Sequence, residues 1–133
     1  LRKTPAVAWP TVILLLVAYG IMGTTSWACF TGRLPLWVGA VVNSVCLYML
    51  FTPAHESMHR NASANSTVNE WVMYIATFVV IPFGSGQLMR VMHMQHHRFT
   101  NEENDPDHFL SSHFYLMPLW GFWPFLYLFQ YRQ

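Results

Sequence analysis

The chain has 133 residues, of which 53% are hydrophobic, 17% aromatic and 10% charged. The charged fraction is far below the roughly 25% of an ordinary soluble domain, and a formal net charge of +1 gives no case for binding nucleic acid. The apolar residues form long runs, whereas all six acidic residues fall between positions 56 and 107. This distribution predicts an all-α integral membrane protein with one polar face.

The first apolar run covers residues 6–30, contains no charged residue and follows Arg2 and Lys3. It exceeds the roughly 20 residues that a membrane-spanning helix needs. Gly20 and Gly23 weaken its second half, so a kink or an early end is one alternative. A signal peptide is another, but the run is longer than a typical signal core and no clear cleavage site follows. We expect a retained membrane helix.

A short turn containing Arg33 leads to a second apolar run over residues 34–53. Two spans joined by a short turn form a helical hairpin, whose outer ends lie on the same side of the membrane. That side also carries most of the basic residues: Arg2, Lys3, Arg60, Arg90 and Arg98. The positive-inside rule therefore places it in the cytoplasm.

The second half of the chain alternates polar and apolar segments. We expect a polar loop over 60–69 and an apolar helix over 70–82, which is too short to span and would lie on the membrane surface or dip into it. A helix over 88–99 and a polar turn follow. The aromatic segment 113–131 is either the start of a third span or an interfacial helix.

Histidines gather in two short boxes. His55 and His59 are at positions i and i+4, while His93, His96 and His97 are at i, i+3 and i+4. On helices, these spacings place the imidazoles of each box on one face. Because imidazole is the commonest neutral nitrogen ligand of zinc, iron and copper, the two boxes predict a metal site.

The chemistry of the first box is ambiguous on its own. H-E-S-M-H at 55–59 also matches the zinc-peptidase pattern, in which Glu56 would be the general base. A non-catalytic membrane module that binds metal is a third possibility. Five imidazoles are too many for one tetrahedral zinc and suit two metals. Since no cysteine lies near either box, the ligand set fits non-haem iron that handles O2 better than structural zinc or an iron–sulfur cluster.

H-E-S-M-H and H-M-Q-H-H, together with R-F-T-N at 98–101 and D-P-D at 105–107, resemble the integral-membrane fatty-acid desaturase superfamily. This superfamily also includes hydroxylases and carotenoid ketolases. The resemblance covers residues 34 to about 109, and the flanking motifs are similar to the bacterial acyl-lipid branch.

The resemblance implies what the residues do. The five box histidines would bind two iron ions, and Glu56, Asp105 and Asp107 would accept hydrogen bonds from ligand N–H groups and orient the rings. The substrates would be a lipid acyl chain and O2, with electrons from a ferredoxin or a cytochrome b5-like donor. The reaction would remove hydrogen from an unactivated C–H bond, with desaturation as the leading outcome and hydroxylation as the alternative, in a bacterial inner membrane with both boxes facing the cytoplasm.

The family's third histidine box is missing, because no histidine follows His113. The chain starts at Leu1 and stops at Gln133 within an aromatic run. We therefore expect residues 1–133 to be the N-terminal part of one truncated desaturase domain, inactive alone, in which the two boxes converge on one site.

Overall fold

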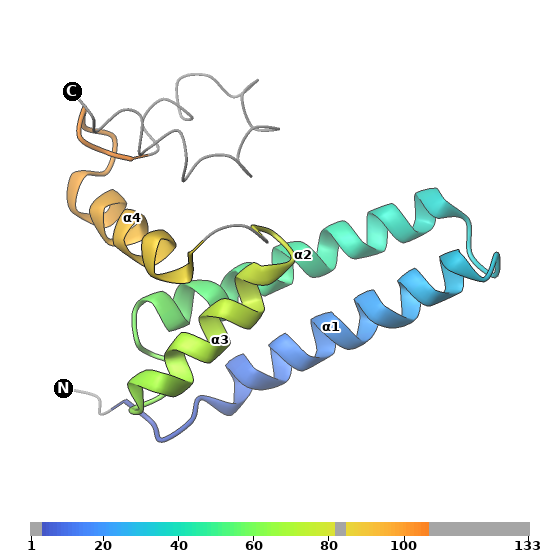
Figure 1. The fold of residues 1–133 in the computed structure, drawn as a ribbon, viewed down its shortest axis with the longest axis horizontal. Helices are drawn as coiled ribbons and strands as arrows, with labels where there is room; N and C mark the ends of the chain where they lie inside the picture. Colours follow the sequence, from blue (N-terminus) through green and yellow to red (C-terminus); the bar gives the residue numbers. More distant parts are fainter. Residues whose placement is uncertain (1–3, 82–84, 107–133) are drawn as a thin grey trace. The chain divides into compact units, whose positions relative to one another are not determined.

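The structure is a computed structural model, which describes residues 4–81 and 85–106. These residues contain four α-helices, α1 to α4, and no β-strand (Figure 1). The chain forms two compact units, residues 1–80 with α1 to α3 and residues 81–133 with α4. The all-α prediction is confirmed for this part of the chain, and the predicted element at 113–131 lies outside it.

The first helix, α1, runs from Trp9 to Phe30, and its 22 residues correspond to about 33 Å. It starts three residues later than predicted because the preceding segment makes backbone hydrogen bonds elsewhere. The amide of Ala8 donates to the carbonyl of Ala62 at 2.7 Å, and the amide of Ala64 donates to that of Pro5 at 2.8 Å. The glycines within α1 do not interrupt it.

Gly32 reverses the chain after α1. Its φ of 70° lies in the left-handed region, which glycine enters without steric cost. The amides of Arg33 and Leu34 then donate to the carbonyl of Ala28 at 2.8 and 3.1 Å, which satisfies the end of the helix. The Arg33 guanidinium lies 4.4 Å from the centre of the Trp27 ring, a cation–π contact that closes the turn.

The second helix, α2, comprises Leu36–Met58 and continues through Pro53, so the predicted end at residue 53 is wrong. Proline removes one backbone hydrogen bond from a helix interior. Tertiary packing offsets this loss, since Pro53 is fully buried beside Leu50 and Ala54 on the same face. The Ser57 hydroxyl also donates to the Pro53 carbonyl at 2.6 Å. The first histidine box is consequently held on a helix.

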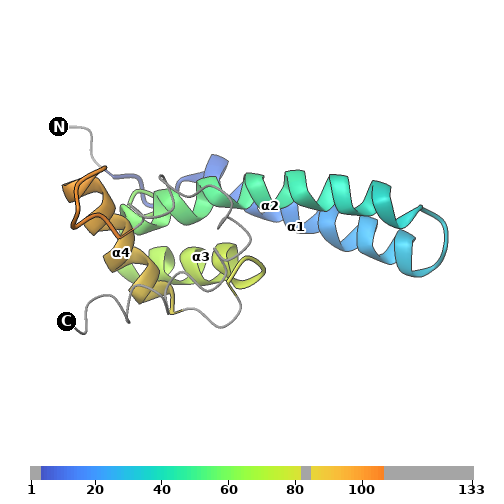
Figure 2. The same cartoon turned by 90° about the horizontal axis from the view of Figure 1, so that it is seen from above.

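Helices α1 and α2 form an antiparallel hairpin (Figure 2). They are in tight contact at Gly39, where an added Cβ atom would lie 2.3 Å from the sulfur of Cys29. One polar contact also joins the helices, because the side-chain amide of Asn43 donates to the Ser26 hydroxyl at 3.1 Å.

The outer surface of this hairpin is apolar and exposed. Only 11% of the most hydrophobic stretch of α1 and 22% of that of α2 is buried, whereas a core helix of a soluble protein would be mostly covered. Both helices are long enough to cross a bilayer. Their exposed side chains include Ile13, Leu16, Val17, Trp37, Val41 and Val45. The predicted integral-membrane hairpin is thus confirmed.

The third helix, α3, comprises Ser66–Phe78 and packs against α2 (Figures 1 and 2). It begins four residues before the predicted position because Asn65 caps it, with its side-chain oxygen accepting from the Thr67 amide at 2.9 Å. The Tyr19 hydroxyl of α1 donates to the carbonyl of Ile75. The helix is therefore fixed to both members of the hairpin.

A buried amide organises the loop before α3. The side-chain nitrogen of Asn69 donates to the carbonyls of Ser63 and Asn65 at 2.6 and 3.0 Å, and its oxygen accepts from the Ser63 amide at 3.2 Å. Asn69 and Ser63 are each only 2% exposed. The Ser63 hydroxyl donates in turn to the carbonyl of Ala6, so the loop is an ordered connection between the N-terminal segment and α3.

The described part of the second unit consists of α4, Gly86–Phe99, and the polar turn after it. The Ser85 hydroxyl caps the helix by accepting from the Leu88 amide at 3.4 Å. The helix ends at Phe99 with Thr100 as its C-cap, and Asn101 follows with a φ of 63°. Both the predicted helix and the predicted turn are present.

Candidate metal centre

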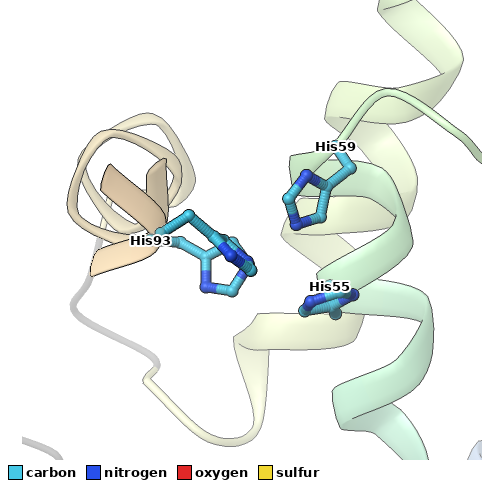
Figure 3. Close-up of side chains that lie close together, drawn as sticks. His55, His59 and His93 are labelled. Carbon is cyan, nitrogen blue, oxygen red and sulfur yellow. The ribbon is translucent and has the colours of Figure 1, made fainter. Parts of the chain in front are cut away.

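The first histidine box lies at the C-terminal end of α2, with His55 in the last turn and His59 at the C-cap position. The rings of His55 and His59 project from the same side of the helix, with centroids 4.6 Å apart (Figure 3). The Phe51 ring, one turn earlier, lies 5.7 Å from that of His55. Residues i and i+4 share a helix face, so continuation of α2 past Pro53 brings the two imidazoles together.

Directly after this box, the chain leaves the helix through a tight hydrogen-bonded turn. The amide of Arg60 donates to the carbonyl of Ser57 at 3.0 Å, and the amide of Asn61 donates to that of Glu56 at 2.8 Å. This pair of bonds is a Schellman motif, which needs a left-handed residue at its centre. Arg60 supplies it, with a φ of 59°. The position of His59 is thereby fixed by the backbone on both sides.

Glu56 lies beside the first box. One of its carboxylate oxygens is 3.7 Å from the Nδ1 atom of His55, and its side chain is 37% exposed. This distance allows an electrostatic attraction but exceeds that of a hydrogen bond. The carboxylate can therefore influence the orientation of the His55 ring, and only a small approach would let it accept the Nδ1 proton.

The second box lies on the C-terminal half of α4. The Nε2 atoms of His93 and His97 are 3.1 Å apart, and the two rings meet edge to face with centroids 4.6 Å apart. The ring of His96 lies 6.5 Å from that of His93 and 5.8 Å from that of His97. Three imidazoles are thus gathered on one side of this helix, as their spacing predicts.

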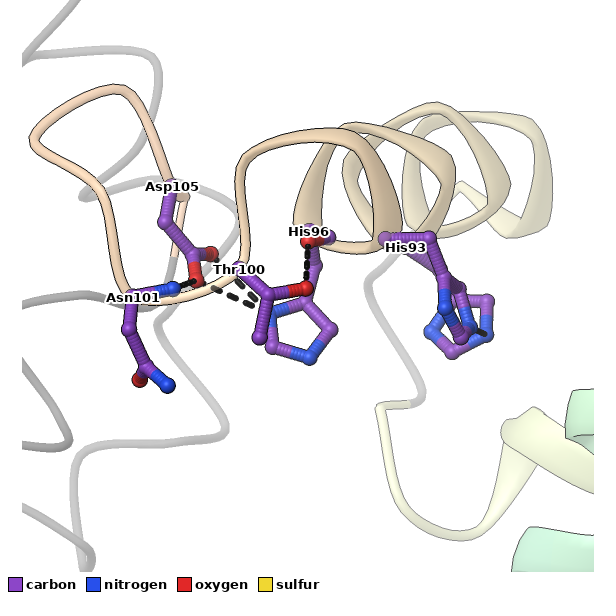
Figure 4. Close-up of polar contacts among 6 residues, drawn as sticks. His93, His96, Thr100, Asn101 and Asp105 are labelled. Atoms are coloured by element: carbon purple, nitrogen blue, oxygen red, sulfur yellow. Dashed lines mark hydrogen bonds and ion pairs between the residues drawn. The ribbon is translucent and has the colours of Figure 1, made fainter.

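The polar turn after α4 holds His96 through Asp105 (Figure 4). The Nδ1 atom of His96 lies 3.0 and 3.1 Å from the two carboxylate oxygens of Asp105. Asp105 also accepts from the Asn101 amide at 2.7 Å, and its side chain is 1% exposed. The Thr100 hydroxyl donates to the carbonyl of His96 at 2.7 Å. This arrangement favours the tautomer of His96 that carries its proton on Nδ1.

A metal ion fits the chemistry of these donors. Neutral imidazole nitrogens at ligand spacing, with a carboxylate bonded to the remote ring nitrogen, are the usual elements of a histidine metal site. The contribution of Asn101, which positions Asp105 through its backbone, was not predicted from the sequence. The sequence feature that could have indicated this role is an asparagine just after the predicted end of a helix, a position where left-handed conformations are common. Asp107, His108 and His113 lie outside the described residues.

Comparisons with known proteins cover both boxes. Residues 31–133 match the family model for fatty acid desaturases. Over 98 residues, the chain is 37% identical to the sn-1 oleoyl-lipid 12-desaturase of Arthrospira platensis, an alignment that covers 71% of this chain and 26% of that protein. The chain therefore spans about a quarter of the length of this curated relative. No solved structure gives a significant match.

Proposed function

Because the chain belongs to the fatty acid desaturase family, we propose that its histidine boxes form part of a non-haem di-iron site for the O2-dependent desaturation of lipid acyl chains. The observation that carries this proposal is the pairing of imidazoles on single helix faces, at His55 and His59 and again at His93 and His97. These pairs occur in a chain with a membrane-spanning hairpin, so a metal site and access to lipid are combined in one polypeptide.

The number and type of ligands favour two iron ions. Five imidazoles exceed the ligand set of one tetrahedral zinc, and no thiolate is available near either box. We assign His55, His59, His93, His96 and His97 as iron ligands. When bound, the irons supply the activation of O2 that breaking an unactivated C–H bond requires.

The acidic residues have the role of orienting ligands. Because Asp105 is hydrogen-bonded to Nδ1 of His96, the lone pair of the Nε2 atom points away from the carboxylate and is available to coordinate a metal ion. We assign Glu56 the same role toward His55 once the carboxylate closes the 3.7 Å separation. Asp107, two residues after Asp105, is the third proposed acceptor.

The family and the relative support the proposed substrate and partners. The relative's name specifies an acyl chain carried on a lipid, which supports a lipid-bound acyl substrate for this chain as well. Desaturation consumes O2 and two electrons. We propose that a ferredoxin or a cytochrome b5-like protein donates these electrons. Arg60, which follows the first box directly, and the two basic residues that precede α1 in the sequence, Arg2 and Lys3, support a cytoplasmic location of the boxes at a bacterial inner membrane.

Metal analysis tests this proposal against the zinc-peptidase alternative. The purified membrane protein should contain iron, at about two ions per site for a di-iron centre. A single zinc, together with peptide hydrolysis, would contradict the proposal and favour the peptidase.

The variant Glu56→Gln separates the two functions further. In a peptidase, loss of the general base abolishes turnover while zinc remains bound. At a di-iron site, loss of an orienting carboxylate should instead lower iron affinity by about 10–100-fold. The variant Glu102→Gln, which changes an exposed acid in the turn after α4, is the matched control.

A further inference from the structure

The chain adopts an unfavourable backbone conformation directly after the first histidine box. Arg60 follows His59 and has a φ of 59°, in the left-handed region that is disfavoured for a residue with a side chain. Such a conformation persists only where the surrounding structure imposes it. The contacts that hold the chain after Arg60 therefore also determine where the end of α2, and with it His59, is placed.

The first of these contacts is made by Asn69, in the first turn of α3. The oxygen of its side-chain amide accepts from the Ser63 amide at 3.2 Å, and its nitrogen donates to the Ser63 carbonyl at 2.6 Å. Both residues are only 2% exposed. Because water does not reach this buried position, loss of the Asn69 amide would leave both backbone groups of Ser63 without a partner.

The same loop is bonded on its other side to the segment before α1, beside which it lies (Figure 1). The amide of Ala8 donates to the carbonyl of Ala62 at 2.7 Å, and the amide of Ala64 donates to that of Pro5 at 2.8 Å. The segment lies outside the part of the chain that matches the family model. The loop is thus held between α3 and the N-terminal segment.

The left-handed conformation of Arg60 connects this loop to the end of α2. It allows the amides of Arg60 and Asn61 to donate to the carbonyls of Ser57 and Glu56, at 3.0 and 2.8 Å. Only two residues lie between Arg60 and Ser63, so a displacement of Ser63 changes the backbone angles at Arg60. Release of Ser63 would therefore relax the strained residue and break these two bonds.

From these contacts we propose that Asn69 is a positioning residue for the first histidine box. By holding Ser63, it keeps Arg60 in the left-handed conformation and His59 in place before a metal ion binds. A ligand that already has its bound orientation loses less conformational freedom on binding, so the affinity for metal is higher. This inference rests on the proposed metal-binding function of the box, and Asn69 itself does not contact the metal.

Hydrogen exchange of the metal-free protein tests the connection between Asn69 and the box. In Asn69→Ala, the amides of Arg60 and Asn61 should exchange about tenfold faster, because loss of a buried hydrogen-bond partner makes local opening easier. The matched control is Asn43→Ala, which removes another side-chain amide, bonded to Ser26 at 3.1 Å and nearer the other end of α2. It should leave exchange at both amides unchanged. Unchanged exchange in Asn69→Ala, or equal acceleration in both variants, would overturn the proposal.

Cobalt(II) binding tests the consequence for the metal. The purified protein in detergent is titrated with cobalt(II), whose visible absorption depends on the geometry of its ligands. Asn69→Ala should bind about tenfold more weakly, at the lower end of the range for residues that orient metal ligands, and its absorption bands should shift at saturation. Asn43→Ala should change neither. An affinity and a spectrum equal to those of the parent in Asn69→Ala would overturn the proposal.

The two measurements separate this inference from the proposed function. A parent protein that binds no cobalt would contradict metal binding by the boxes, whereas the exchange measurement contains no metal and still decides whether Asn69 holds the end of α2.

A second variant releases the loop from its other side and leaves Asn69 intact. Ala8→Pro removes the amide that donates to Ala62, and the φ of Ala8, −81°, is near the value that proline fixes. Circular dichroism checks that each variant keeps its helix content. Exchange at the amides of Arg60 and Asn61 should accelerate in Ala8→Pro as it does in Asn69→Ala. Unchanged exchange in a folded Ala8→Pro would show that the loop does not hold the end of α2, and would overturn the proposal even if Asn69→Ala fails to fold.

Discussion

The imidazole of His96 and the carboxylate of Asp105 are joined through Nδ1, at 3.0 and 3.1 Å from the two carboxylate oxygens. The acid is buried and also bonded to the Asn101 amide, so the turn after α4 fixes its position. Loss of this carboxylate would therefore release the orientation of one proposed ligand without altering the helix that carries it.

Asp105→Asn should reduce the affinity for iron by about 10–100-fold, because the amide cannot accept from both His96 and Asn101 in the same way. Iron binding by the purified protein, followed by metal analysis after dialysis against graded chelator, measures the change. Glu103→Gln, at an exposed acid of the same turn, is the control. Equal losses in the two variants would show that charge near the site matters and that the hydrogen bond to His96 does not.

Gly39→Ala should destabilise the hairpin by about 1–3 kcal/mol, the usual range for overpacking. The added methyl carbon would lie 2.3 Å from the Cys29 sulfur. Gly23→Ala, where nothing lies within 4 Å, should change stability by less than about 1 kcal/mol. Unfolding in mixed micelles measures both, and the double variant Cys29→Ala/Gly39→Ala should recover most of the loss. If the double variant does not recover stability, the destabilisation by Gly39→Ala does not come from a clash with the Cys29 side chain.

Asn69→Ala should cost about 1–3 kcal/mol of unfolding free energy, because it leaves buried backbone groups of Ser63 without their partner. The exposed Asn61 provides a control, for which Asn61→Ala should stay within about 0.5 kcal/mol of the parent. Hydrogen exchange at the Ser63 amide should accelerate only in the first variant. Unchanged exchange there would contradict the proposed role of the Asn69 side chain.

Arg60→Gly should stabilise the protein by about 1 kcal/mol, since a residue with a side chain is strained at a φ of 59° and glycine is not. Arg60→Ala keeps the strain while removing the charge, and it should bring no gain. The two variants are compared by thermal unfolding in detergent. A gain in stability in both variants would show that loss of the Arg60 charge, and not relief of backbone strain, causes the effect.

The fold was largely predictable because long charge-free runs identify membrane helices. The errors concern helix ends. The apolar pattern of α3 starts near Glu70, yet the helix begins at Ser66, because the Asn65 side chain caps it. Local sequence suggested an end at Pro53, whereas burial of that residue among long-range neighbours keeps α2 helical.

The proposed ligands were predictable from histidine spacing alone, since a helix converts i and i+4 into neighbours. The resemblance implied that the two acids of the D-P-D motif accept hydrogen bonds from ligand rings, without saying which ring. In the described residues, Asp105 makes such a contact with His96. The choice depends on the shape of the turn, including the left-handed Asn101, and the sequence does not specify that shape.

The direction of each histidine-bearing helix has an electrostatic consequence. A helix accumulates partial negative charge at its C-terminal end, about half an elementary charge. His55 is in the last turn of α2, and His96 and His97 are in the last turn of α4, so these three imidazoles stand at the negative poles of their own helices. A cation held at either pole is favoured by about 0.3–1 kcal/mol, and an anion is disfavoured. Each helix thus attracts a positive ion to its imidazoles before any coordinate bond has formed.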